Sequence, residues 1–193
     1  MPVKTFVVTS QWDTALPEDW RARLTRLLGE RPRRLDLWAE LGLFGALSCL
    51  EGAGEASLPG DAVIMVTSRR GTHTSTRAAM AQMEHDLPMP LTFLQSQPNQ
   101  LLAHLAARTH WRGYACFLGG TSRLNSLYLA AQLAGSGGVL FGELDDTDGA
   151  VTRWLRLRPC HTDRGDLIDV APEALFSTEL SCLGIGAGGL VGC

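Results

Sequence analysis

A glycine-rich turn that ends in hydroxyl side chains is the part of the sequence best suited to nucleophilic chemistry. Gly119-Gly-Thr-Ser122 follows an apolar segment, residues 114–118, that predicts a strand, and precedes an apolar helix predicted over 122–134. A serine becomes a nucleophile when an adjacent base activates it, and no base lies near Ser122 in the sequence. The alternative is that Ser122 caps the helix, which its position at the turn explains fully.

The cysteines do not form a recognisable framework. They are Cys49, Cys116, Cys160, Cys182 and Cys193. Their number is odd and no CxxC pair occurs, so we expect neither a disulfide framework nor a zinc ribbon. Cys116 lies between two apolar residues of the strand predicted over 114–118, where we expect it to be buried and unreactive.

Three further motifs fall short of a metal or cofactor site. Cys160-His161 offers two ligands, whereas tetrahedral zinc needs three or four in register. Residues 145–149 carry carboxylates but lack the spacing and final glutamate of a calcium loop. Gly184 to Gly189 fits GxGxxG, but the sequence stops at Cys193, before the helix and acid that a dinucleotide site requires. We expect no cofactor and no metal.

Composition and charge exclude several functions. The 193 residues are 45% hydrophobic and 19% charged, which is typical of a folded protein, and we expect a single domain over 1–193. The net charge of −3 argues against nucleic-acid binding. The longest apolar stretch, residues 41–50, is far below the roughly 20 residues of a membrane span, so we expect no membrane span and a cytoplasmic protein.

Two small clusters of arginine are locally basic although the net charge of the chain is negative. Arg31, Arg33 and Arg34 form the first cluster, and Arg69 and Arg70 form the second. The clusters are either solvated surface or a docking site that attracts an acidic partner by its charge.

Strands and helices alternate along the chain. The patterns predict strands over 5–9, 62–67, 114–118, 137–142 and 151–157, and helices over 17–29, 35–50, 72–85, 98–110, 122–134 and near 172–175. The strands over 5–9 and 62–67 and the helix over 35–50 should be buried. Pro88 and Pro90 predict an extended loop, alternation over 151–157 predicts an outer strand, and the end of the chain reads as a Gly-rich tail. The alternation gives an α/β layered fold.

The order of several segments resembles the N-terminal half of a β-ketoacyl synthase. Residues 90–99, the helix after them and Gly113 resemble the family's stretch that leads into the nucleophile strand, and the spacing matches without a gap. Further segments that resemble the family are residues 5–9, 34–36, 62–72, 130–145 and 186–191. The resemblance covers residues 3–146 and, weakly, the tail. It implies a layered, thiolase-like half fold with a mixed central sheet and helices on both faces.

The catalytic residues of that family are missing. The family's cysteine sits in an Ala-Cys-Ser/Thr-Ser turn at a helix N-terminus. Counting forward from Gly113 puts Ser122 at that position, and counting back from Ala130 puts Gly119 or Gly120 there. The catalytic histidines of the family belong to a second half that this sequence does not reach. We therefore expect no condensing activity from the chain alone.

The resemblance implies a non-catalytic subunit similar to the chain-length factors of type II fatty acid, polyketide or aryl polyene synthesis. Such a subunit pairs with a full-length ketosynthase and shapes its acyl pocket. The matching residues for the acyl pocket or dimer seam are Leu91, Phe93, Cys116 and Phe117, with core packing as the alternative for the 91–93 stretch. The basic residues that would dock an acyl carrier protein are Arg33, Arg34, Arg69 and Arg70.

Association is also expected from the strand predicted over 114–118. This strand has no lysine, proline or inward-pointing charge to protect an edge, so it predicts pairing with a second copy or with a ketosynthase. Two other functions stay open. One is an acyltransferase or hydrolase that acts on acyl-carrier-protein thioesters through Ser122, and the other is a stand-alone homodimer that binds an acyl group.

Overall fold

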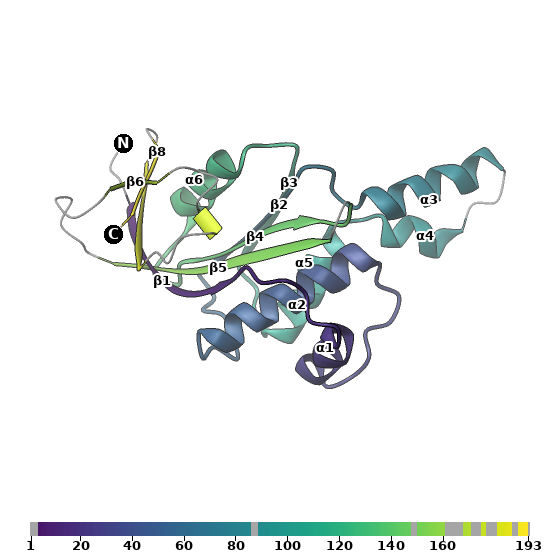
Figure 1. Ribbon diagram of the computed structural model, residues 1–193, viewed down its shortest axis with the longest axis horizontal. Coiled ribbons are helices and arrows are strands. Elements are labelled where there is room, and N and C mark those ends of the chain that lie inside the picture. Colours follow the sequence, from purple (N-terminus) through teal and green to yellow (C-terminus); the bar gives the residue numbers. More distant parts are fainter. Residues whose placement is uncertain are drawn as a thin grey trace.

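One mixed sheet runs through the described part of the molecule (Figure 1). The computed structural model describes residues 4–85, 89–147, 150–160, 168–170, 175–176, 181–186 and 189–192. The sheet has eight strands in the order β3-β2-β4-β5-β1-β7-β8-β6. The strands are β1 (Lys4–Trp12), β2 (Val63–Ser68), β3 (Tyr114–Gly119), β4 (Val139–Asp145), β5 (Val151–Pro159), β6 (Ile168–Val170), β7 (Cys182–Gly186) and β8 (Gly189–Gly192). β2 is parallel to β3 and β4, and the pairs from β4 onward are antiparallel.

Helices cover both faces of the sheet, as the α/β layered prediction requires. They are α1 (Trp20–Leu28), α2 (Leu37–Gly52), α3 (His73–Glu84), α4 (Pro90–Gln95), α5 (Asn99–Arg108) and α6 (Arg123–Leu133). Helices α1, α2 and α5 pack on one face and α6 packs on the other (Figure 1). Each face has its own apolar core, and the strands lie between the two cores.

Helix α2 is buried along most of its length, as its apolar circumference predicts. It packs against α1, α5 and the sheet strands β1, β4 and β5. Its approach to β5 is close at Gly45, where a Cβ atom would lie 2.5 Å from the indole of Trp154. Asp36 begins the helix by accepting a hydrogen bond from the Ala39 N–H at 2.8 Å.

Two predictions about single elements are wrong, because the same local sequence pattern is compatible with two different structures. β5 was expected at the outside of the sheet, but it lies between β4 and β1. Pro90 was expected to enforce an extended loop together with Pro88, but Pro90 is the first residue of α4, and Pro88 lies outside the described residues. Proline suits that position because the first helical N–H has no intrahelical partner.

One further correction concerns the start of the chain. β1 was expected to be a short buried strand, but it spans nine residues and only Phe6 is fully buried. At the other end, the Gly-rich segment forms β7 and β8, which pair with each other, so the GxGxxG match is part of two strands and not a dinucleotide site, as expected. Cys182 is disulfide-bonded, and its partner falls outside the described residues. Of the helix expected near 172–175, only the turn at Leu175 and Phe176 is described.

Candidate functional site

The direction of the chain connections changes at β2, which makes its carboxyl end a candidate site. From β2 the chain passes through α3, α4 and α5 to β3 on one side, and β4 lies on the other side after α6. In open α/β sheets, ligands bind in the crevice outside the carboxyl ends of the strands at such a switch point. Here the ends of β2, β3 and β4 are Ser68, Gly119 and Asp145.

Hydroxyl groups connect the end of β2 to the turn before α6. The backbone carbonyl of Ser68 accepts a hydrogen bond from Gly120 N–H at 2.9 Å. The Thr67 hydroxyl donates to the Leu118 carbonyl at 3.1 Å, and the Thr121 and Ser126 hydroxyls lie 2.8 Å apart. Gly120 has φ of 70°, a left-handed conformation that favours glycine. These bonds fix the turn that presents Ser122.

Ser122 caps α6, as one of its two interpretations predicted. Its Oγ accepts a hydrogen bond from Asn125 N–H at 3.2 Å, and the residue is exposed to solvent. Within the described residues, no histidine, lysine or carboxylate is hydrogen-bonded to this hydroxyl. The described residues therefore provide no hydrogen-bonded base that would activate Ser122, and its role as a nucleophile stays a prediction.

β3 forms the end of the sheet and pairs with β2 alone among the described strands. Its side chains alternate between the two cores: Ala115 and Phe117 pack on the α2 face, and Cys116 and Leu118 pack on the α6 face. Phe117 contacts Trp38 edge-on, with ring centroids 5.6 Å apart. The open edge that we expected for this strand is present among the described strands. The Phe117 side chain, however, packs on the core of the α2 face.

The two cysteines near the cores differ in burial. Cys116 is only partly buried, whereas the sequence predicts burial, because β3 ends the sheet and has a neighbouring strand on one side only among the described strands. Its expected lack of reactivity stays a prediction. Cys49 is fully buried in α2, and burial raises the pKa of its thiol to about 12.

Leu91 and Phe93 lie on an arm that projects from the sheet. Helices α3 and α4 pack against each other and extend away from the remainder of the molecule (Figure 1). Leu91 is 41% exposed and Phe93 59% exposed. The arm also exposes Met80, Met83, Met89 and Leu94. Core packing is therefore wrong for Leu91 and Phe93, which face solvent in the single chain.

Comparison with known proteins gives relatives only among solved structures. No family model matches the chain, and no curated protein matches it. One similar structure is a ketosynthase (ApeO) in complex with its chain length factor (ApeC) from Xenorhabdus doucetiae. The TM-score is 0.51 at 19% identity, over 82% of this chain and 77% of that chain. Another is the ishigamide ketosynthase/chain length factor, with a TM-score of 0.59 at 14% identity, over 73% of this chain and 49% of that chain.

The chain has a ketosynthase-like fold. This confirms the fold that the resemblance implied. The matched chain of the ApeO–ApeC complex is similar in length to this one, since the match covers similar shares of both. The chain spans about half of the ishigamide chain.

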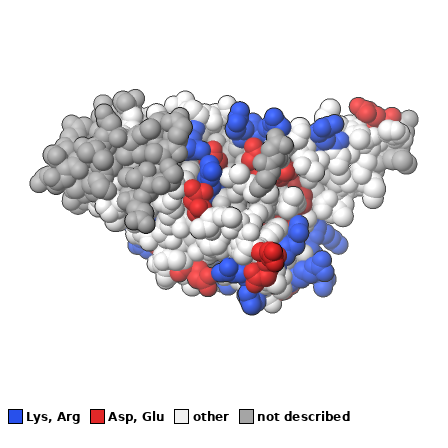
Figure 2. Space-filling view, viewed as in Figure 1, with Lys and Arg blue, Asp and Glu red and all other residues white. Residues whose placement is uncertain are grey.

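Within this ketosynthase-like fold, the predicted basic residues are exposed on separate segments. Arg33 and Arg34 lie between α1 and α2, and Arg69 and Arg70 follow β2. Among the described residues, none of the four has an ion-pair partner. Figure 2 shows basic side chains near α1, at the lower edge of that view. The clusters are solvated, and the docking of a carrier protein stays a prediction.

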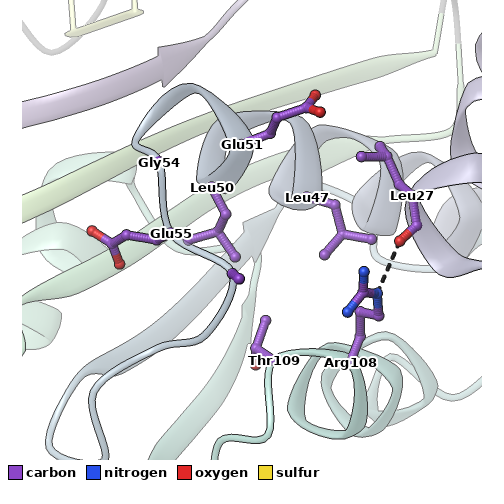
Figure 3. A pocket seen from close by; sticks show the side chains of 9 residues that line it. Leu27, Leu47, Leu50, Glu51, Gly54, Glu55, Arg108 and Thr109 are labelled. Carbon is purple, nitrogen blue, oxygen red and sulfur yellow. Dashed lines mark hydrogen bonds between the residues drawn. The ribbon is translucent and has the colours of Figure 1, made fainter.

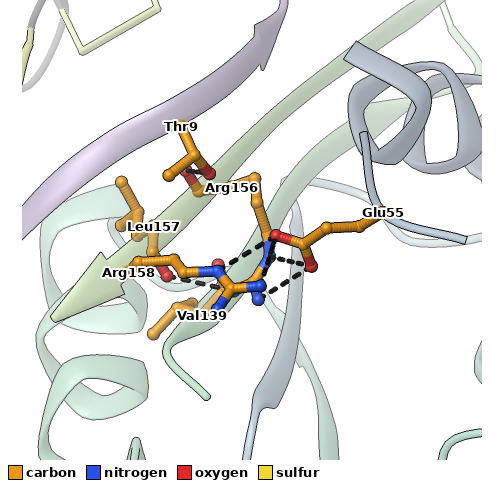
Figure 4. Close-up of polar contacts among 6 residues, drawn as sticks. All are labelled: Thr9, Glu55, Val139, Arg156, Leu157 and Arg158. Atoms are coloured by element: carbon orange, nitrogen blue, oxygen red, sulfur yellow. Dashed lines mark hydrogen bonds and ion pairs between the residues drawn. The ribbon is translucent and has the colours of Figure 1, made fainter. Parts of the chain in front are cut away.

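The sequence did not predict the ion pairs that connect β5 to the loop after α2. Arg156 is fully buried, and its guanidinium lies 3.0 Å from a Glu55 carboxylate oxygen that belongs to the loop after α2 (Figure 4). Arg158 lies 3.0 Å from the other oxygen of Glu55. Arg156 also donates to the carbonyls of Val139 and Leu157. Burial lowers the pKa of Arg156, and Glu55 counteracts this effect.

The described residues hold no group of three or more His, Cys, Asp or Glu side chains that could bind a metal ion. Over the same residues, no helix is long and apolar enough to cross a membrane.

Proposed function

We propose that the chain is a non-catalytic, chain-length-factor-like subunit that pairs with a ketosynthase and shapes its acyl pocket in type II fatty acid or polyketide synthesis. One observation carries this proposal. The resemblance puts the family's nucleophile at the turn before α6. There Ser122 serves as a helix cap, and none of the described residues provides a base that is hydrogen-bonded to it. A ketosynthase-like fold without an activated nucleophile suits a partner role better than a catalytic one.

The surface for this partner is the β3 edge together with the α3–α4 arm. β3 ends the sheet in the described residues, so one row of its backbone N–H and C=O groups has no strand beside it. The arm presents six large apolar side chains that are each 41% exposed or more. Exposed apolar patches of this kind mark interaction sites. We assign Leu91 and Phe93 to the contact with the partner, and the backbone of residues 114–119 to strand pairing.

The similar structures support a ketosynthase as the partner. Both are described as ketosynthases with chain length factors. In the proposed complex, Arg33, Arg34, Arg69 and Arg70 attract an acidic acyl carrier protein. The proposal also places the protein in the cytoplasm and treats residues 1–193 as one domain.

Sedimentation of the chain with a candidate full-length ketosynthase tests the pairing. We expect a stable complex with the wild type, and at least a tenfold weaker complex with Met83→Glu/Phe93→Glu, because both introduced charges would be desolvated in the contact. Leu129→Glu is the matched control, because Leu129 is 38% exposed on α6, outside the arm. Equal weakening by Leu129→Glu, or no complex with any ketosynthase, would reject the proposed surface.

A second experiment separates this role from an enzyme that uses Ser122. The chain is incubated with an acyl-carrier-protein thioester and examined by mass spectrometry. We expect no acyl group on Ser122 and no hydrolysis above the rate without protein. An acyl adduct that disappears in Ser122→Ala would establish the acyltransferase or hydrolase instead.

A further inference from the structure

Two hollows lie side by side where α1, α2 and α5 end, and Arg108 lines both. The first hollow has a volume of about 330 Å³, and its apolar lining residues are Leu27, Leu47 and Leu50 (Figure 3) together with Ala56. The second has a volume of about 320 Å³, and its lining includes Arg31, Arg33 and His104. Both volumes fall in the range of about 300–1,000 Å³ that is typical of small-molecule sites.

The first hollow is mainly apolar because its acidic residues turn away from the leucines. Figure 3 shows the side chains of Glu51 and Glu55 directed away from Leu47 and Leu50. The Glu55 carboxylate is occupied by Arg156 and Arg158, each at 3.0 Å. The leucines are thus left as the surface that a hydrocarbon chain could contact.

The second hollow has an excess of positive charge. Arg31, Arg33 and Arg108 line it, with Glu30 as the acidic lining residue. Among the described residues, neither Arg31 nor Arg33 has an ion-pair or hydrogen-bond partner that would neutralise it. A ligand with a negative group can therefore bind these arginines without displacing a protein carboxylate.

Arg108 is held in place between the two hollows. Its Nε donates a hydrogen bond to the Leu27 carbonyl at 2.9 Å (Figure 3). This bond orients the planar guanidinium and leaves the Nη groups for a ligand. Arginine binds carboxylate and phosphate with two parallel hydrogen bonds, which gives both affinity and direction.

We propose that the two hollows bind one amphiphilic anion, whose hydrocarbon chain lies against Leu27, Leu47 and Leu50 and whose carboxylate or phosphate contacts Arg108, Arg31 and Arg33. The site is formed by elements other than the β3 edge and the arm. It goes beyond the proposed function, and the failure of either proposal leaves the other standing.

Calorimetric titration with ten-carbon amphiphiles below their micelle concentrations tests the site. The probes are decanoate, decyl phosphate, decanol and decyltrimethylammonium. We expect one anion to bind per chain, at least tenfold tighter than the alcohol or the cation. Tighter binding of decyl phosphate than of decanoate would assign a phosphate headgroup, and the reverse order a carboxylate. Equal affinity for anion and cation would overturn the proposal.

Variants test the two hollows separately. Arg31→Gln/Arg33→Gln should weaken decanoate binding about tenfold, whereas Arg77→Gln/Arg112→Gln, which removes two exposed arginines outside both hollows, should leave it unchanged. In the wild type, decanoate should bind about tenfold tighter than octanoate because of its two extra methylenes. Ala56→Trp, at an exposed position of the first hollow, should abolish that difference. Equal weakening by both arginine pairs, or a chain-length effect that persists in Ala56→Trp, would contradict the site.

Discussion

Ser122 stabilises the start of α6 because its side-chain hydroxyl accepts a hydrogen bond from Asn125 N–H. Ser122→Ala leaves that backbone donor without its cap, so we expect the free energy of unfolding to fall by about 1 kcal/mol. Ser122→Asp keeps an acceptor at the helix N-terminus and should retain the stability. Urea denaturation measures both. A loss well above 2 kcal/mol in Ser122→Ala would show that the hydroxyl does more than cap the helix.

The second residue of consequence is Glu55, since it neutralises a fully buried arginine. Glu55→Gln leaves the charge of Arg156 buried without a carboxylate, and we expect a loss of about 3–5 kcal/mol in the free energy of unfolding. Arg158→Gln is the matched control, because the Arg158 side chain is 42% exposed and its pair with Glu55 should contribute less than about 1 kcal/mol. Similar losses in both variants would contradict this difference between Arg156 and Arg158.

Asp36 gives a prediction about pH. Burial raises the pKa of Asp36 above 3.8, and the hydrogen bonds from Ser75 and Ala39 oppose that shift. Because its pKa is raised in the folded state, Asp36 favours folding below pH 3.8 and loses that contribution as pH rises through its folded pKa. Asp36→Asn keeps the cap and removes the titration, so its stability relative to the wild type should increase from pH 3.5 to pH 7, as measured by urea titrations. A constant difference across this range would contradict the raised pKa.

At the scale of the elements, β3 combines an open edge with side chains that serve the two cores. Phe117→Lys puts a charge against Trp38, so we expect it to lower the free energy of unfolding by about 1–3 kcal/mol rather than to act only on association. Tyr114→Lys, at a residue that is 50% exposed on the same strand, should change stability by less than about 0.5 kcal/mol. Thermal unfolding of both variants measures these stabilities and shows whether Phe117 supports the core or acts only at the open edge of the sheet. Equal stability of the two would show that Phe117 does not support the core.

The elements also show what the sequence could and could not predict. Regular apolar spacing and recognisable end residues located α1, α2, α5 and α6, because helix periodicity is a local property. α4 was missed because a proline can close an extended segment or open a helix, and the choice depends on what the next residues pack against. β5 was misplaced because Arg156 looks solvated in the sequence, while its partner Glu55 is 101 residues away. For the same reason, Arg31 and Arg33 stood out in the sequence only as a basic cluster, and the hollows around Arg108, built from the ends of three helices, could not be predicted.

For the whole molecule, the exposed arm and the edge of β3 predict self-association when no ketosynthase is present. We expect the chain to sediment as a dimer at micromolar concentration, and Met83→Glu/Phe93→Glu to shift it toward the monomer, because the apolar side chains of the arm would otherwise remain in water. Sedimentation of the wild type and of the double variant at several concentrations measures the fraction of dimer in each. A wild-type chain that stays monomeric throughout would contradict this prediction and leave only a partner of different sequence.

The position of β5 between β4 and β1 has a consequence for how the chain is made. β1 comprises residues 4–12 and pairs with β5 and β7, the first of which begins at residue 151. At the usual speed of translation, roughly 5–20 residues per second, β1 leaves the ribosome on the order of ten seconds before either neighbour exists. During that interval its backbone groups have no partner strand, and unpaired strands of this kind aggregate. Among the described strands, β1 thus waits longest for its first neighbour, which makes it the strand most exposed to wrong pairing while the chain grows.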